Sequence, residues 1–196
     1  MPSFVQKIKT IIARPFCVVP PNILSLVSLF LAFPGFFFLS VGNSTAGSLF
    51  IVGAMFDAVD GEVARLTKRV TAFGGILDAT LDRIFEGLLL LSIGIGGLVP
   101  WPWLFGCQLA SLCVSYVKAK AEAVTKTAQI GTNTFSVGIA GRAIRLALLF
   151  LGTLLNPLAP WFSMHALTWA VILVAILSSY TFVIRFWKIY QVVDRG

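Results

Sequence analysis

Six stretches of largely apolar residues follow one another along this chain, and they constrain its fold more than any other feature. They lie at 22–41, 47–66, 74–98, 103–124, 137–155 and 164–186. Each is close to the length of about 20 residues that an α-helix needs to cross the hydrocarbon layer of a bilayer. The sequence therefore predicts an all-α, polytopic membrane protein with six transmembrane helices.

The overall composition supports this class of protein. Of the 196 residues, 58% are hydrophobic and only 12% are charged, whereas a soluble domain has about 25% charged residues. So few charges cannot cover a surface that faces water, and the same figures exclude a disordered chain. We expect a single membrane-embedded domain over residues 1–196, with the six-helix bundle at 22–190.

The basic residues indicate how the chain lies in the membrane. The connections at 42–46, 97–102 and 156–163 contain no Lys or Arg, whereas basic residues gather at both termini and around 66–73 and 125–136. Because Lys and Arg are enriched on the cytoplasmic side, we expect both termini and these two loops to face the cytoplasm. The protein is then a multi-pass protein of the cell membrane.

Residues 1–20 are too short and too polar to span a bilayer. Their apolar side chains alternate with Lys7, Lys9 and Arg14 at roughly helical spacing. This pattern predicts an amphipathic helix that lies on the inner leaflet before the chain enters the membrane.

Acidic residues occur where a membrane span should contain none. The second and third predicted spans contain Asp57, Asp60, Glu62, Asp78, Asp82 and Glu86. A charge at the centre of a spanning helix costs about 2.5–3.5 kcal/mol on insertion scales, so such residues usually face a polar cavity and mark function. A purely structural alternative pairs them with Arg65 and Arg83, but two arginines cannot neutralise six carboxylates. A bound multivalent cation is the simpler interpretation.

Four of these acids have a spacing that suits a shared metal site. Asp57 and Asp60 are three residues apart and Asp78 and Asp82 are four apart, so each pair lies on one face of its helix. The two helices are consecutive and antiparallel, which brings the pairs to a similar depth. Since carboxylate oxygens select hard cations, we expect one or two Mg²⁺ ions there, with Mn²⁺ as the alternative.

Small residues lie at the inner ends of the same two helices: Gly61, Ala64, Gly74 and Gly75. They are consistent with close helix packing. They are equally consistent with a flat ligand that lies against the backbone beside a metal, and both interpretations stay open.

The acids and small residues together form a known pattern. It reads Asp57-x-x-Asp60-Gly61-x-x-Ala64-Arg65, then eight residues, Gly74, three residues, Asp78, three residues and Asp82. Over these 26 residues the chain resembles the CDP-alcohol phosphotransferases, membrane enzymes of phospholipid synthesis. The resemblance implies transfer of a phosphatidyl-type group from a CDP-lipid to an alcohol, with release of CMP.

The resemblance also implies roles for individual residues. The four aspartates would bind the metal, and Asp82 would also be the general base that removes a proton from the acceptor hydroxyl. Members of this family are commonly homodimers, which we also expect here. The residues that would contact the CDP-lipid are Asn22, Gly61, Ala64, Arg65, Thr71 and Gly74.

A second polar cluster bears on the identity of the acceptor. Lys118 lies at the end of the fourth predicted span, and Arg142 and Arg145 enter the fifth on one helical face. Ordinary flanking charge explains such residues in general, but apolar residues follow Arg145 immediately. Because Arg is suited to bidentate phosphate binding, we expect these three residues to bind a phosphorylated acceptor.

The residues Ser115–Glu122, followed by Arg142-x-x-Arg145, resemble the corresponding residues in one branch of the family. The enzymes of this branch make phosphatidylinositol phosphate or its archaeal ether-lipid counterpart, archaetidylinositol phosphate. Inositol 1-phosphate is therefore the expected acceptor. Gly141 stands where those relatives often have an acid, so glycerol 3-phosphate is kept as the alternative.

Two other classes of protein are alternatives to an enzyme. A cation transporter would explain the intramembrane carboxylates, but such folds often have interrupted helices in two related halves, and here the acids lie in two adjacent spans. A structural membrane scaffold explains only the hydrophobicity. The expected partners are a CDP-lipid, a phosphorylated polyol and membrane lipids, and no nucleic acid.

Overall fold

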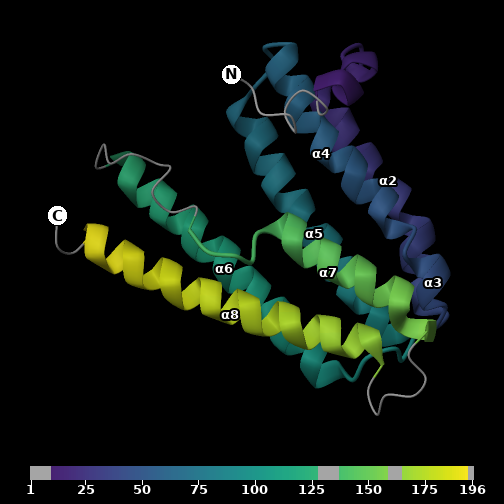
Figure 1. The fold of residues 1–196 in the computed structure, drawn as a ribbon. Helices are drawn as coiled ribbons and strands as arrows, with labels where there is room; N and C mark the ends of the chain where they lie inside the picture. The colour runs from purple at the N-terminus through teal and green to yellow at the C-terminus, as the bar shows by residue number, and fades with distance from the viewer. Residues whose placement is uncertain (1–9, 128–136, 159–164, 194–196) are drawn as a thin grey trace. The chain divides into compact units, whose positions relative to one another are not determined.

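The structure is a computed structural model that describes residues 10–127, 137–158 and 165–193, and its regular structure over these residues is helical. The elements are η1 (Arg14–Phe16), α2 (Pro21–Ser40), α3 (Ser44–Gly47), α4 (Phe50–Leu66), α5 (Ala72–Ile95), α6 (Trp101–Thr127), α7 (Arg142–Leu155), η3 (Asn156–Leu158) and α8 (Ala166–Val193) (Figure 1). The predicted all-α class is confirmed. The chain divides into two compact units, residues 1–96 and 97–196, and each is described by itself.

The helices follow the predicted spans with three differences. The stretch 47–66 is helical as α4 from Phe50 onward, and only its first residue, Gly47, belongs to the short α3. The stretch 137–155 is helical only from Arg142, because Gly138 has a φ of 113° and Gly141, the N-cap, is extended with a ψ of 156°. The last helix continues beyond 186, to Val193.

Two of the described helices are long and apolar enough to cross a membrane by length and composition. They are α2 and the part of α8 from Ala166 to Val192. The count of six spans stays a prediction. Of the predicted N-terminal amphipathic helix, residues 1–9 lie outside the described residues, and residues 10–13 are helical.

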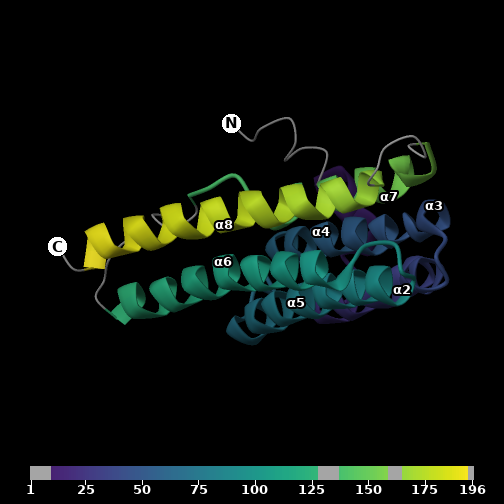
Figure 2. The same cartoon turned by 90° about the horizontal axis from the view of Figure 1, so that it is seen from below.

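In the first unit, α2 packs against both α4 and α5, as the two views of the ribbon show (Figure 2). Two glycines let α2 and α4 approach closely. A Cβ atom at Gly53 would collide with the Ser28 carbonyl, and one at Gly35 would collide with the backbone of Phe50. Small residues at such contacts are typical of helix packing in membrane proteins.

The side chain of Phe85 anchors α5 to the other two helices. Its ring meets that of Phe36 edge-on, with centroids 5.3 Å apart, and lies 6.4 Å from the ring of Phe50. Residues seven positions apart on a helix share a face. The packing of Phe85 therefore turns Asp78, seven residues earlier, toward the same side of α5.

The segment before α2 also packs onto this unit. Ala13 is fully buried in a cluster with Leu24 of α2 and Val63 of α4. The ring of Phe16 meets that of Phe56 on α4 edge-on, with centroids 5.5 Å apart. These contacts place residues 10–16 beside the end of α4 that carries the acidic motif.

The second unit is built on α8. Helices α6 and α8 lie side by side, and α7 packs against α8, which both ribbon views show. A Cβ atom at Gly152 of α7 would lie 3.2 Å from the Leu167 Cα atom, so this crossing is close. The Asn156 side chain accepts a hydrogen bond of 3.3 Å from the Leu167 backbone N–H near the start of α8.

Candidate metal and nucleotide site

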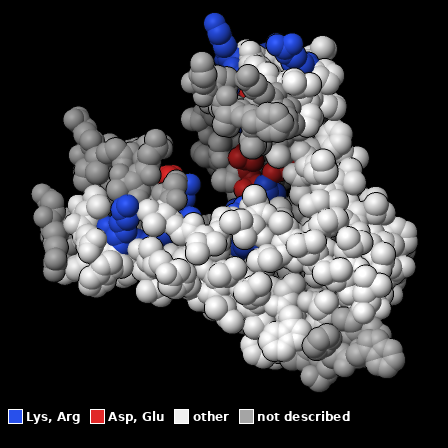
Figure 3. Space-filling view, viewed as in Figure 1, with Lys and Arg blue, Asp and Glu red and all other residues white. Residues whose placement is uncertain are grey.

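Three carboxylates from two helices meet in the first unit. Asp57 and Asp60 of α4 and Asp78 of α5 each offer an oxygen, and these oxygens lie within 4.8 Å of one another. Asp57 and Asp60 are 8% and 5% exposed. In Figure 3 most of the visible acidic atoms form one cluster, and a few others lie apart from it. Buried carboxylates this close repel one another when ionised, and an all-oxygen set of donors fits a hard divalent cation.

Ser25 of α2 is a fourth side chain at this site. It is buried, and its hydroxyl donates a hydrogen bond to Asp60 Oδ2. It also lies 3.2 Å from the Pro21 carbonyl oxygen, one turn earlier. We did not predict Ser25 from the sequence, although a serine four residues after Pro21 in an apolar stretch was an available signal.

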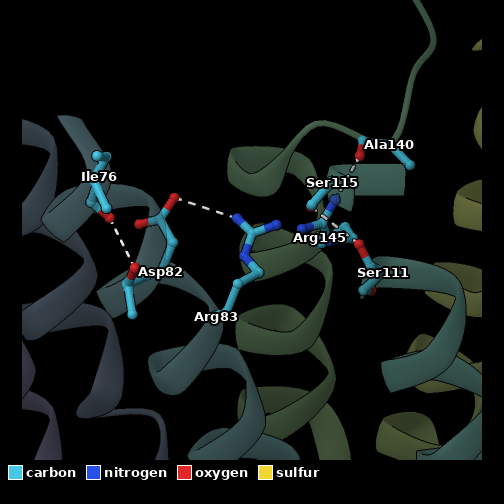
Figure 4. Close-up of polar contacts among 8 residues, drawn as sticks. Ile76, Asp82, Arg83, Ser111, Ser115, Ala140 and Arg145 are labelled. Atoms are coloured by element: carbon cyan, nitrogen blue, oxygen red, sulfur yellow. Dashed lines mark hydrogen bonds and ion pairs between the residues drawn. The ribbon is translucent and has the colours of Figure 1, made fainter. Parts of the chain in front are cut away.

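Asp82, the predicted base, lies one turn beyond Asp78 on α5. It is not in the group of three carboxylates that the described residues form. Its Oδ2 atom lies 3.3 Å from Nη2 of the adjacent Arg83 (Figure 4). The structure thus brings together three of the four predicted metal ligands and places the fourth nearby on the same helix.

A pocket of about 190 Å³ opens beside these acids, at the ends of α2, α4 and α5. All six residues predicted to contact the CDP-lipid line it, together with Asp60 and Asp78. Three of the other lining residues, Ser25, Arg69 and Val70, were not predicted as ligand contacts, whereas for Gly75 this interpretation had been left open. The motif residues and the N-terminal turn of α2 therefore form one site.

The pocket glycines have different surroundings. A Cβ atom at Gly61 or Gly75 would meet nothing within 4 Å in the described part of the chain, so both border open space in the pocket. A Cβ atom at Gly74 would lie 3.0 Å from Thr71 Oγ1 and 3.1 Å from Asn22 Oδ1. Gly74 thus permits local packing, whereas Gly61 and Gly75 favour the interpretation of a ligand lying against the backbone.

Thr71 shapes the pocket through the backbone. It is the N-cap of α5, and its hydroxyl oxygen accepts a hydrogen bond of 3.0 Å from the Gly74 N–H. Such a cap stabilises the first turn of a helix by about 1 kcal/mol. Predicted as a CDP contact, Thr71 therefore also fixes where α5 begins.

Glu62 holds the pocket arginine. Its Oε2 atom accepts hydrogen bonds from Arg65 Nε at 3.1 Å and from Nη2 at 2.9 Å. Its Oε1 atom accepts a hydrogen bond of 2.9 Å from the Thr10 hydroxyl. Arg65 pairs with Glu62 and Arg83 pairs with Asp82. Two of the six acids are therefore paired with arginine, as the structural alternative proposed.

The predicted acceptor residues lie in the second unit. Arg145 is 2% exposed, and its Nη1 atom donates a hydrogen bond of 2.8 Å to the Ala140 carbonyl (Figure 4). Lys118 Nζ lies 3.8 Å from Glu122 Oε1 on the same helix. Arg142 is half-buried at the start of α7.

Arg185 of α8 joins this group, and the sequence interpretation missed it by counting it as a flanking charge. It is 8% exposed, and it donates hydrogen bonds to the carbonyls of Val137 at 2.7 Å and Val114 at 3.1 Å. Its guanidinium interacts electrostatically with Arg145 and Glu122. Its position inside the predicted span 164–186 was the available signal.

Residues 18–177 match the family model described as CDP-alcohol phosphatidyltransferase. The chain belongs to this family. The predicted family, its enzyme class and its place in phospholipid synthesis are thereby confirmed. Membership and the two apolar helices also support a membrane protein.

Several relatives have assigned activities. The archaetidylinositol phosphate synthase of Pyrococcus horikoshii is 34% identical over 179 residues, covering 91% of this chain and 87% of the relative. The phosphatidylinositol phosphate synthase of Corynebacterium glutamicum is 32% identical over 183 residues, covering 85% of this chain and 76% of the relative.

Solved structures of phosphatidylinositol phosphate synthase from Mycobacterium tuberculosis are also similar. The one with CDP-DAG bound has a TM-score of 0.75 and 27% identity, covering 94% of each chain. The one in complex with manganese and citrate has a TM-score of 0.76 and 27% identity, covering 93% of this chain and 89% of the other. The manganese complex of this structural neighbour and the group of three aspartates in this chain both support the expectation of a bound metal.

Proposed function

We propose that this protein transfers a phosphatidyl or archaetidyl group from a CDP-lipid to the hydroxyl of inositol 1-phosphate and releases CMP. One observation carries this proposal: the six residues predicted to contact the CDP-lipid line the same pocket as Asp60 and Asp78. Support for the acceptor comes from the relatives named as archaetidylinositol phosphate and phosphatidylinositol phosphate synthases.

The metal in this proposal is Mg²⁺, with Mn²⁺ as a substitute, held by Asp57, Asp60 and Asp78. When bound, a divalent cation neutralises negative charge on the diphosphate oxygens during phosphoryl transfer. The protein supplies the frame for this ion, because Ser25 orients Asp60 through its hydrogen bond.

The pocket residues bind and orient the CDP-lipid. Gly61 and Gly75 leave the backbone of two helices open to a flat base. Arg65, fixed on one side by Glu62, has further N–H groups with which it would bind the diphosphate, a geometry that suits a guanidinium.

Asp82 acts as the general base in the proposed reaction. The acceptor oxygen attacks the phosphorus atom that carries the lipid, the bond from that phosphorus to the CMP oxygen breaks, and Asp82 takes the hydroxyl proton. A positioned base of this kind contributes about 10²–10⁴-fold to a rate.

The acceptor phosphate is assigned to the cations of the second unit. Arg145 and Arg185 are both buried and interact electrostatically. Lys118 in the second half of α6 and Arg142 at the start of α7 add positive charge. A phosphate monoester is the ligand chemistry that such a concentration of guanidinium groups suits. Glycerol 3-phosphate shares this chemistry and is the alternative acceptor.

Orientation and assembly complete the proposal. Six spans, cytoplasmic termini and a cytoplasmic active site follow from the distribution of Lys and Arg. A homodimer is proposed from the family resemblance.

The test is acceptor-dependent release of CMP by the purified protein in Mg²⁺, with CDP-diacylglycerol and its dialkyl ether analogue as donors. Inositol 1-phosphate, glycerol 3-phosphate, serine and free inositol are compared in parallel. We expect CMP with inositol 1-phosphate and none with free inositol. Turnover with serine or free inositol would contradict the phosphorylated acceptor, and ion flux without any CMP would favour a transporter.

A further inference from the structure

Residues 137–141, called here the 137–141 loop, are held by side chains of the helices around them. The Ala140 carbonyl accepts a hydrogen bond of 2.8 Å from Arg145 Nη1, and the Val137 carbonyl accepts one of 2.7 Å from Arg185 Nε. The Ala140 N–H donates a hydrogen bond of 3.1 Å to Thr181 Oγ1 on α8. The loop thus links Thr181 to both buried arginines.

Thr181 is fully buried, and the loop closes directly onto it. Gly138 has a φ of 113°, and a Cβ atom at Gly138 would collide with the Thr181 side chain. A positive φ and this lack of space both favour glycine. Gly138 therefore packs tightly against the Thr181 side chain.

The two arginines need such support because of their charge. Arg145 and Arg185 are 2% and 8% exposed and interact electrostatically. Burying like charges close together is unfavourable unless other groups satisfy them. The loop carbonyls accept from one N–H of each guanidinium, and Arg185 also donates to the Val114 carbonyl, which fixes the planes of both groups.

We propose that Thr181 is a positioning residue for the acceptor: through the 137–141 loop it orients Arg145 and Arg185 toward the acceptor's phosphate. The inference rests on the proposed function, which assigns these arginines to a phosphorylated alcohol. Bidentate phosphate binding depends on the orientation of the planar guanidinium. Without the Thr181 hydroxyl, the Ala140 N–H loses its hydrogen bond. The Ala140 carbonyl, which accepts from Arg145, is then no longer held in place.

The experiment compares Thr181→Val and Thr181→Ala, which remove the hydroxyl, with Thr181→Ser, which keeps it. The matched control is Ser178→Ala on the same helix. Ser178 is also fully buried, but its hydroxyl has no hydrogen-bond partner among the residues that the structure describes. The KM for inositol 1-phosphate and for CDP-lipid, and kcat, are measured for each variant.

We expect Thr181→Val and Thr181→Ala to raise the KM for inositol 1-phosphate about tenfold, in line with the loss of one buried hydrogen bond. The KM for CDP-lipid should stay unchanged, and Thr181→Ser and Ser178→Ala should resemble the wild type. If Thr181→Val does not fold, Thr181→Ala is compared with Thr181→Ser. Both variants lack the threonine methyl group, and they differ only in the hydroxyl.

Three results would overturn the inference. They are an unchanged acceptor KM in the variants without the hydroxyl, an equal rise in the KM of both substrates, and a Thr181→Ser variant that behaves like Thr181→Ala. The wild-type measurement separates this from the proposed function. A wild type that uses no phosphorylated acceptor overturns both, whereas an active wild type with insensitive Thr181 variants overturns the positioning role alone.

Discussion

Ser25 on α2 donates a hydrogen bond to the Asp60 carboxylate on α4, 35 positions away in the sequence. The contact joins the N-terminal turn of α2 to the carboxylate group formed with Asp57 and Asp78. By holding Oδ2, it orients the Asp60 side chain within this group.

Removal of this hydroxyl should weaken metal binding. Groups that orient metal ligands typically contribute about 10–100-fold to metal affinity or activity, so Ser25→Ala should lower Mn²⁺ affinity by about tenfold or more. The measurement is titration of the purified protein with Mn²⁺. Ser28→Ala is the matched control, because the buried Ser28 hydroxyl donates a hydrogen bond of 2.7 Å to the Ser25 carbonyl and none to a carboxylate among the described residues. Equal affinities in the two variants would show that the contact does not support the metal.

Glu62→Gln should weaken binding of the CDP-lipid. The substitution removes the charge that holds Arg65, whose side chain is 63% exposed. Exposed ion pairs contribute about 0.2–1 kcal/mol, so the KM for CDP-lipid should rise only about two- to fivefold. The acceptor KM should not change. Thr10→Val removes the other hydrogen bond to Glu62 and should have a smaller effect; the reverse order would assign the main role to the N-terminal segment.

Asp82→Asn should abolish turnover while binding of CDP-lipid with Mg²⁺ stays largely intact. A loss of about 10²-fold or more is expected for a general base, and Asp82 lies outside the three-carboxylate group of the described residues. Thr80→Val is the control on the same helix, because its exposed hydroxyl donates a hydrogen bond of 2.8 Å to the Ile76 carbonyl, one turn earlier. Rates are compared by CMP release, and near-normal turnover of Asp82→Asn would remove it as the base.

Gly53 and Gly61, two glycines of α4, should respond in opposite ways to alanine. Gly53→Ala places a methyl group against the Ser28 carbonyl, and overpacking of this kind typically costs about 1–3 kcal/mol. Gly61→Ala meets no atom within 4 Å in the described residues, and alanine stabilises a helix interior by about 0.5–1 kcal/mol relative to glycine. Thermal melting should therefore fall for Gly53→Ala only. Gly61→Ala should instead raise the KM for CDP-lipid, and an unchanged KM would mean that no ligand lies against this glycine.

Arg145→Lys should raise the KM for inositol 1-phosphate far more than the KM for CDP-lipid. Lysine keeps the charge but loses the planar fork that binds phosphate and donates to the Ala140 carbonyl. Steady-state kinetics with each substrate varied in turn measure the difference. Lys120→Arg, a change at an exposed position of α6, is the control for a basic substitution. An equal rise for both substrates would reassign Arg145 to the stability of the second unit.

The sequence by itself determined the helical class, the acids inside apolar stretches and six of the residues that line the candidate pocket. These features are local. The spacing of Asp57 and Asp60 sets their common face on one helix, and the motif specifies which small residues stand beside them. The six residues that the motif and its family resemblance predict as CDP-lipid contacts all line one pocket.

Only the tertiary structure decided which residues from other elements complete each site. Ser25 reaches Asp60 from 35 positions away, and Arg185 reaches the Val137 carbonyl from 48 positions away. It also decided that the helix of 137–155 begins at Arg142, after a loop in which Ala140 donates a hydrogen bond to Thr181. Such contacts depend on the rotation and separation of packed helices, which the periodicity of one helix does not specify. The helical period can place a side chain on a face, but the packing of neighbouring helices determines what that face meets.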